Sequence, residues 1–121
     1  MRKILVVDDE NDICDFVKTF FRDRGFQVFT ALSGEDALMI TKKERPDLIL
    51  LDIKMKNMDG LAVLKHIKEL DKTIKIIMVT ALDDQEKMRE AYKLGAIDYI
   101  TKPLALDYLE ETVGRNLKIA L

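Results

Sequence analysis

The chain has 121 residues, with 20 Lys and Arg against 22 Asp and Glu and a formal net charge of -2. This near balance argues against a protein that coats nucleic acid or a membrane surface, since such proteins draw their affinity from a basic excess. With 48% hydrophobic and 35% charged residues, the composition is that of one globular domain, expected over residues 1–121. No apolar run approaches the roughly 18 residues of a membrane span, so we expect a soluble protein with no membrane partner.

The single cysteine, Cys14, cannot form an internal disulfide, and no apolar region typical of a signal peptide is found at Met1–Lys3. Both observations favour a cytoplasmic location. Ile13, Phe16 and Val17 surround Cys14 in a helical pattern, so we interpret it as a core residue and not as a nucleophile.

Five aliphatic runs alternate with longer amphipathic segments, which is the pattern of a parallel sheet with helices on its faces. In chain order the expected strands are Ile4–Val7, Phe26–Phe29, Leu48–Leu51, Ile74–Val79 and Ile97–Ile100. The first and third runs are apolar throughout and should be covered on both faces. The second and fifth are mixed, as edge strands are, and the predicted fold class is α/β.

Five helices are expected between and after these strands. The first repeats apolar residues over Ile13–Phe21, with Gly25 beyond its end. Ser33 caps the second, which Pro46 stops. The remaining three are predicted over Gly60–Leu70, Asp83–Leu94 and Leu106–Leu117.

Charged and hydroxyl side chains follow four of the strands. In an open parallel sheet, ligands bind outside the carboxyl ends of the strands. Asp8, Asp9 and Glu10 follow the first run, Asp52 the third, Thr80 and Ala81 the fourth, and Lys102 the fifth. We therefore expect one site at this edge, to which the second strand contributes nothing comparable.

Three carboxylates, Asp8, Asp9 and Asp52, would repel one another there unless they are protonated or bridged by a cation. Mg²⁺, with Mn²⁺ as an alternative, takes such oxygen ligands, whereas zinc would favour histidines, which these segments lack. A phosphoryl group could then be held by Lys102, the Thr80 hydroxyl and nearby backbone N–H groups such as that of Ala81. Asp52 follows the most apolar central run and is the best candidate for a nucleophile that forms an acyl phosphate.

Each residue also has a plainer interpretation. An aspartate after a strand is equally often a cap or turn residue, and Thr80, Lys102 or Tyr99 alone would be an ordinary strand or loop residue. The combination is what favours a site. A cis peptide at Lys102–Pro103 would aim the lysine inward.

With these residues, the sequence closely resembles the receiver domain of bacterial two-component response regulators. The resemblance covers essentially the whole chain and is carried by Ile4–Glu10, Pro46–Asp52, Met58–Gly60, Thr80–Ala81, Gly95–Ala96 and Asp98–Pro103. It implies a three-layer, flavodoxin-like (βα)5 fold with a doubly wound parallel sheet of strand order 2-1-3-4-5.

The resemblance also implies roles for the site residues. Asp52 would accept a phosphoryl group from a phosphohistidine on a histidine kinase or phosphotransferase. Asp9, Asp52 and the carbonyl of Lys54 would hold Mg²⁺, with Asp8 assisting through water. Thr80 and Lys102 would bind the phosphoryl oxygens. Tyr99 would move inward with Thr80, which switches the surface formed by the fourth helix, the fifth strand and the fifth helix.

Some residues depart from the family pattern. Lys56, followed by Asn57, stands where many members have proline, so the loop after Asp52 should be less rigid. Lys54 and Leu82 occupy two positions that tune phosphoryl lifetime, and neither could position a water, which predicts slow autodephosphorylation. His66, the only histidine, is interpreted as a solvated helix residue.

Other functions can be compared with this one. A phosphatase of the haloacid dehalogenase type would carry Asp-x-Asp after the first strand, and a flavodoxin-like carrier would not place Asp8, Asp9 and Glu10 beside a flavin phosphate. We expect no enzymatic activity beyond self-phosphorylation and autodephosphorylation. The chain would act alone by protein contact, or as the amino-terminal receiver of a transcription factor or hybrid kinase. It would be a monomer or a phosphorylation-dependent dimer without direct nucleic-acid binding.

Overall fold

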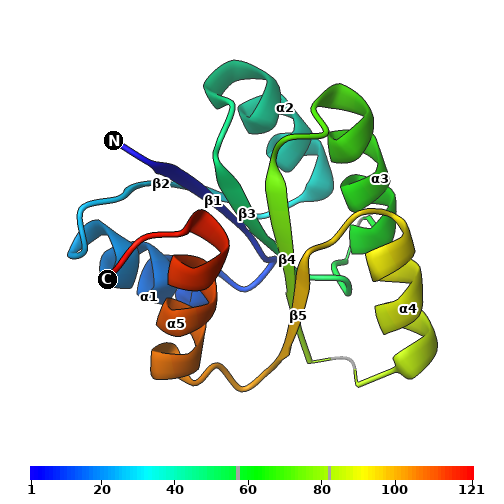
Figure 1. Ribbon diagram of the computed structural model, residues 1–121. Coiled ribbons are helices and arrows are strands. Elements are labelled where there is room, and N and C mark those ends of the chain that lie inside the picture. The colour runs from blue at the N-terminus through cyan, green and yellow to red at the C-terminus, as the bar shows by residue number, and fades with distance from the viewer. Residues whose placement is uncertain (57, 82) are drawn as a thin grey trace.

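The computed structural model describes residues 1–56, 58–81 and 83–121. In this part of the chain, strands and helices alternate throughout (Figure 1). The strands are β1 (Lys3–Val7), β2 (Gln27–Ala31), β3 (Leu48–Leu51), β4 (Lys75–Thr80) and β5 (Asp98–Thr101). The helices are α1 (Asn11–Arg22), α2 (Gly34–Glu44), α3 (Gly60–Leu70), α4 (Gln85–Lys93) and α5 (Leu106–Leu117). Each expected element is present within a few residues of its predicted bounds.

All strand pairs are parallel, and the sheet has the order β2-β1-β3-β4-β5. The two mixed runs, β2 and β5, form its edges, while the apolar runs β1 and β3 lie inside. The α/β prediction is therefore confirmed, as is the strand order that the resemblance implied. The chain reverses direction across the sheet between β1 and β3, which is where ligands bind in folds of this kind.

Side chains of the central strands alternate between two separate cores. Leu5 and Ile49 belong to the core under α2, α3 and α4, whereas Ile4 and Leu48 belong to the core under α1 and α5. All four are fully buried. Each such side chain contributes roughly 1.5–3 kcal/mol by leaving water, so the apolar composition of these strands accounts for the three layers.

Polar side chains fix where two of the helices begin. The Ser33 hydroxyl accepts a hydrogen bond from the Asp36 amide at 3.2 Å, as the predicted cap of α2 requires. The fourth helix begins at Gln85, two residues later than expected. The reason is that the Asp84 carboxylate accepts the Glu86 amide at 2.9 Å and so acts as the N-cap.

Candidate functional site

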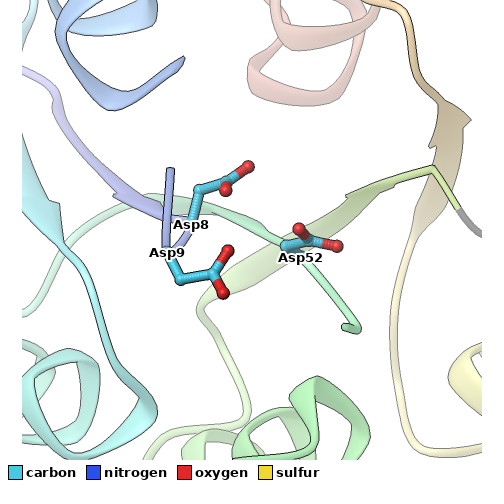
Figure 2. Close-up of side chains that lie close together, drawn as sticks. All are labelled: Asp8, Asp9 and Asp52. Atoms are coloured by element: carbon cyan, nitrogen blue, oxygen red, sulfur yellow. The ribbon is translucent and has the colours of Figure 1, made fainter. Parts of the chain in front are cut away.

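Three carboxylates converge at the carboxyl ends of β1 and β3 (Figure 2). Asp8 and Asp9 directly follow β1, and Asp52 directly follows β3, its neighbour in the sheet. One oxygen from each residue lies within 4.8 Å of the others. Asp8 and Asp52 are only 2% and 5% exposed, and Asp9 is half-buried, so the expected clustering of these three acids is confirmed.

The ammonium group of Lys102 reaches two of these acids from the end of β5. Its Nζ lies 2.6 Å from Asp8 Oδ2 and 3.2 Å from Asp52 Oδ2. Burial alone would lower the pKa of Lys102, but the hydrogen bond to Asp8 and the negative charges of Asp52 and Asp8 outweigh it and raise the pKa. Lys102 is therefore a fixed positive charge. The Lys102–Pro103 peptide, whose cis form the sequence left open, is cis.

Backbone amides fix the orientation of the carboxylates. The Glu10 amide donates to Asp8 Oδ1 at 3.0 Å, and the Lys54 amide donates to Asp52 Oδ1 at 3.2 Å. The Lys56 amide crosses from the β3–α3 loop to Asp9 Oδ2, also at 3.2 Å. These donors partly offset the repulsion among the acids, because a hydrogen bond to an ionised group is stronger than a neutral one.

Gly60 brings the start of α3 against the backbone of Asp52. A Cβ at this position would lie 2.1 Å from the Asp52 carbonyl oxygen, and the Gly60 amide donates to the Ile53 carbonyl at 2.7 Å. Only glycine permits this approach without displacing the loop. Neither the place of Gly60 in the site nor the hydrogen bond from the Lys56 amide was expected from the sequence. The Asp-Gly pair before an apolar helical run was the available signal for the first.

Thr80 and Tyr99 lie inside the protein beside the cluster. Thr80 ends β4 and is fully buried, and Tyr99, on the neighbouring β5, is 8% exposed. Burial is the main cause that raises the pKa of Tyr99, with smaller contributions from the charges of Asp84 and Asp83. Tyr99 therefore points inward in this structure. Ala81 is exposed next to Thr80.

The donor set of the cluster fits a hard divalent cation. It consists of three carboxylates, and no histidine or cysteine belongs to it among the described residues. Mg²⁺ is bound in proteins by one or two carboxylates together with carbonyl and water oxygens, so these residues suit it. Lys102 leaves room for such an ion, because it contacts Asp8 and Asp52 and no contact joins it to Asp9.

Two other side chains that could react, Cys14 and His66, do not belong to the cluster. Cys14 is buried, its Sγ donates to the Asp8 carbonyl at 3.4 Å, and burial raises its pKa to about 11. His66 is exposed on α3, 3.4 Å from Glu69. Both agree with the sequence interpretation. Asn57 and Leu82, which the sequence analysis linked to loop rigidity and phosphoryl lifetime, lie outside the described residues.

Comparison with known proteins identifies the class to which this fold and site belong. The family profile of the response regulator receiver domain matches residues 4–114. The chain therefore belongs to the response regulator receiver family and is a receiver domain of two-component signalling.

Individual relatives include both short and long proteins. The chain is 39% identical over 117 residues to the sporulation initiation phosphotransferase F of Bacillus subtilis, covering 97% of this chain and 94% of that protein. It is 44% identical over 114 residues to the transcriptional regulatory protein ZraR of Salmonella typhimurium, covering 94% of this chain but only 26% of ZraR. The solved structure of the response regulator TrrA from Thermotoga maritima, in complex with Mg²⁺ and BeF, superposes with a TM-score of 0.86. It is 35% identical, and the match covers 95% of this chain and 98% of TrrA.

In the described part of the chain, no helix has both the length and the apolar character needed to cross a membrane.

Proposed function

We propose that Asp52 is the phosphoacceptor of this receiver and that it takes its phosphoryl group from a phosphohistidine on a histidine kinase or histidine phosphotransferase. The observation that carries the proposal is the convergence of Asp52 with Asp8, Asp9 and the Lys102 ammonium at the ends of three strands. Membership of the receiver family favours this function over a phosphatase or a flavin carrier.

Asp52 is suited to attack because its carboxylate is held in place. One oxygen accepts the Lys54 amide at 3.2 Å and the other lies 3.2 Å from Lys102, so the side chain loses little freedom when it reacts. An oxygen of Asp52 forms the new bond to phosphorus, and the histidine nitrogen leaves with the electron pair of the broken bond. Positioning and charge neutralisation account for the rate of a transfer of this kind.

The remaining roles follow from the resemblance to the receiver family. Asp9, Asp52 and the Lys54 carbonyl would hold Mg²⁺, with Asp8 assisting through water. When bound, Mg²⁺ supplies positive charge that offsets the phosphoryl oxygens. Lys102 supplies a second positive charge, while the Thr80 hydroxyl and the Ala81 amide donate hydrogen bonds. Mn²⁺ has the same oxygen preference and is expected to substitute.

The phosphoryl group then acts as a switch. Its added charge draws Lys102 and Thr80 toward the new oxygens. Lys102 directly follows β5 and Thr80 ends β4, and the Lys102 amide donates to the Thr80 carbonyl at 2.8 Å, so a movement of either backbone affects both strands. Tyr99, three residues before Lys102, is the side chain that transmits this change to the surface of α4, β5 and α5.

The output follows one of two patterns that the relatives illustrate. The match covers 94% of the short relative from Bacillus, whereas in ZraR the matching region is about a quarter of the length. The chain acts through protein contact in the first pattern and through a fused effector in the second. We expect a monomer that forms at most a phosphorylation-dependent dimer, no direct nucleic-acid binding, and no catalysis beyond the loading and loss of its own phosphoryl group.

Intact-mass spectrometry after treatment with acetyl phosphate, with and without Mg²⁺, tests the assignment. We expect one Mg²⁺-dependent phosphoryl adduct, localised to Asp52 by peptide mapping and absent from Asp52→Asn. The matched control is Asp59→Asn, in the same loop, whose carboxylate instead caps α3 by accepting the Leu61 amide at 3.0 Å. An adduct on Asp52→Asn equal to that of the unmodified protein would refute the assignment. A half-life of only seconds in a quench assay would contradict the slow autodephosphorylation that we expect.

A further inference from the structure

A basic hollow lies beside the acceptor, formed by the β3–α3 loop and the start of α4. Its volume is about 490 Å³, and its lining includes three lysines, Lys54, Lys56 and Lys87, with a single carboxylate, Asp59. The Asp59 carboxylate is already engaged as the cap of α3. The hollow therefore carries an excess of positive charge next to the most acidic part of the molecule.

The three ammonium groups are not needed for local structure. Among the described residues, no ion pair or side-chain hydrogen bond engages Lys54 Nζ, Lys56 Nζ or Lys87 Nζ. The side chains of Lys54 and Lys56 are exposed, and that of Lys87 is partly exposed. This differs from Lys102, whose ammonium contacts two acids and whose side chain is 11% exposed.

Two of these lysines are attached directly to the site. The Lys54 amide donates to Asp52 and the Lys56 amide donates to Asp9, each at 3.2 Å. Each of these two ammonium groups therefore lies within one hydrogen bond plus one lysine side chain of a carboxylate of the site. A small molecule that approaches Asp52 from this side passes within the field of these charges.

We propose that Lys54, Lys56 and Lys87 form a basic collar that draws freely diffusing, anionic acyl phosphates to Asp52, so that the loading rate depends on the charge of the donor. This inference rests on the proposed function, since it takes Asp52 as the acceptor. In the step itself an Asp52 oxygen attacks phosphorus, the bond between phosphorus and the bridging oxygen breaks, and the carboxylate of the donor leaves with that electron pair. Charge balances without a proton, because one carboxylate and one phosphoryl dianion stand on each side.

The physical reason is electrostatic steering. The three acids of the site repel an incoming dianion, and positive charge beside them raises its local concentration. In water, one ammonium group acting on a dianion at roughly 8 Å changes the encounter rate about threefold when the ionic strength is about 0.03 M. At about 1 M the Debye length falls to roughly 3 Å and the same charge has almost no effect. A strong dependence on salt is therefore the signature of the collar.

The test uses the full chain with saturating Mg²⁺ and acetyl phosphate as donor. Pseudo-first-order loading rates are measured at low and high ionic strength for Lys56→Gln, Lys87→Gln and the double variant. We expect decreases of about threefold for each single variant and about tenfold for the double variant at low salt, and less than twofold at high salt. Lys56→Arg keeps the charge and should keep the rate.

The control variant is Lys72→Gln, which removes the same charge from an exposed turn between α3 and β4. This turn lies at the amino-terminal ends of the strands, opposite the site. It should load at the unaltered rate at both ionic strengths. Phosphoramidate, which carries less net negative charge than acetyl phosphate, should show a smaller effect of the collar variants.

Three outcomes would overturn the inference. These are an unchanged low-salt rate in the double variant, an equal loss at both ionic strengths, and a loss in Lys72→Gln as large as that in Lys56→Gln. In each case Asp52 of the unmodified protein still acquires the adduct, so the proposed function stands. If the unmodified protein acquires no adduct on Asp52 from either donor, the proposed function itself fails, and the proposal of the collar fails with it.

Discussion

Replacing Asp9 with asparagine is expected to stabilise the metal-free protein by about 1 kcal/mol, although it removes a residue of the site. Two unit charges 4.8 Å apart, the outer limit of separation in this cluster, repel by about 3.5 kcal/mol at an effective dielectric constant of about 20. Lys102 compensates one of the other two acids, so Asp9 faces about one uncompensated negative charge. Its partial exposure reduces the remaining repulsion.

Asparagine suits this test because it keeps the shape of the side chain and its acceptor. The Lys56 amide, 3.2 Å from Asp9 Oδ2, can still donate to the amide oxygen. The effect on stability therefore reports charge and not a lost hydrogen bond. In the presence of Mg²⁺ the unmodified protein should become more stable than Asp9→Asn. The reason is that a ligand at 100 times its dissociation constant stabilises the folded state by roughly 2.7 kcal/mol. We expect Asp9→Asn to lose most of that gain.

Equilibrium urea unfolding, followed by far-UV circular dichroism, measures both effects in EDTA and in saturating Mg²⁺. Asp15→Asn, on the exposed side of α1, removes the same charge outside the cluster and serves as control. Its stability should change little, and it should keep the full response to Mg²⁺. A metal-free Asp9→Asn protein less stable than the unmodified protein, or one that Mg²⁺ stabilises as much, would refute the electrostatic account of the cluster.

Three further substitutions and the reactivity of Cys14 test other features of the structure. Gly60→Ala places a Cβ 2.1 Å from the Asp52 carbonyl oxygen, so urea unfolding should show a loss of about 3 kcal/mol and a weaker response to Mg²⁺. Gly25→Ala, with φ of +89° but nothing within 4 Å, should lower stability by only about 1 kcal/mol and leave that response intact. Lys68→Met removes the donor to two carbonyls of the α3–β4 turn, at 3.2 and 2.7 Å, and should lower stability by roughly 1–3 kcal/mol in the same assay. Because burial raises the pKa of Cys14 from 9.0 to about 11, a thiol reagent should label the folded protein at least about 100-fold more slowly than the unfolded chain near neutral pH. Stability should also decrease as the pH rises from 9.0 toward 11, since only the unfolded thiol ionises readily there.

The elements of the fold could be predicted from the sequence because their patterns are local. Continuous apolar runs identified β1 and β3, and Ser33 marked the start of α2. The bounds of β2 differ from the predicted ones because they depend on hydrogen bonds to residues outside the strand. The second strand was expected to begin at Phe26, but the Phe26 amide bonds to Phe21 at 3.1 Å, and the strand instead continues to Ala31 opposite Val7. Strand order likewise depends on which strands meet, and it came from the resemblance and not from periodicity.

The composition of the site was predictable for a similar reason. Parallel strands end at one edge, so acids that follow β1 and β3 must meet there. What the sequence could not show is which atoms make contact. That Lys102 contacts Asp8 and Asp52 but not Asp9, and that the Lys56 amide holds Asp9, depends on side-chain torsions and on the path of the β3–α3 loop. Neither follows from spacing alone.

The position of Lys102 explains how a single charge can both hold the resting site together and report its modification. At rest its ammonium group bridges Asp8 and Asp52 at 2.6 and 3.2 Å. Once Asp52 carries a phosphoryl group, the charge of that carboxylate moves outward onto the phosphoryl oxygens, so Lys102 must follow it or lose one of its two partners. The backbone of Lys102 is tied to β4, because its amide donates to the Thr80 carbonyl at 2.8 Å. Tyr99 lies on β5, which Lys102 directly follows, so the residue that neutralises the acceptor is only three positions along the chain from the side chain proposed to alter the outer surface.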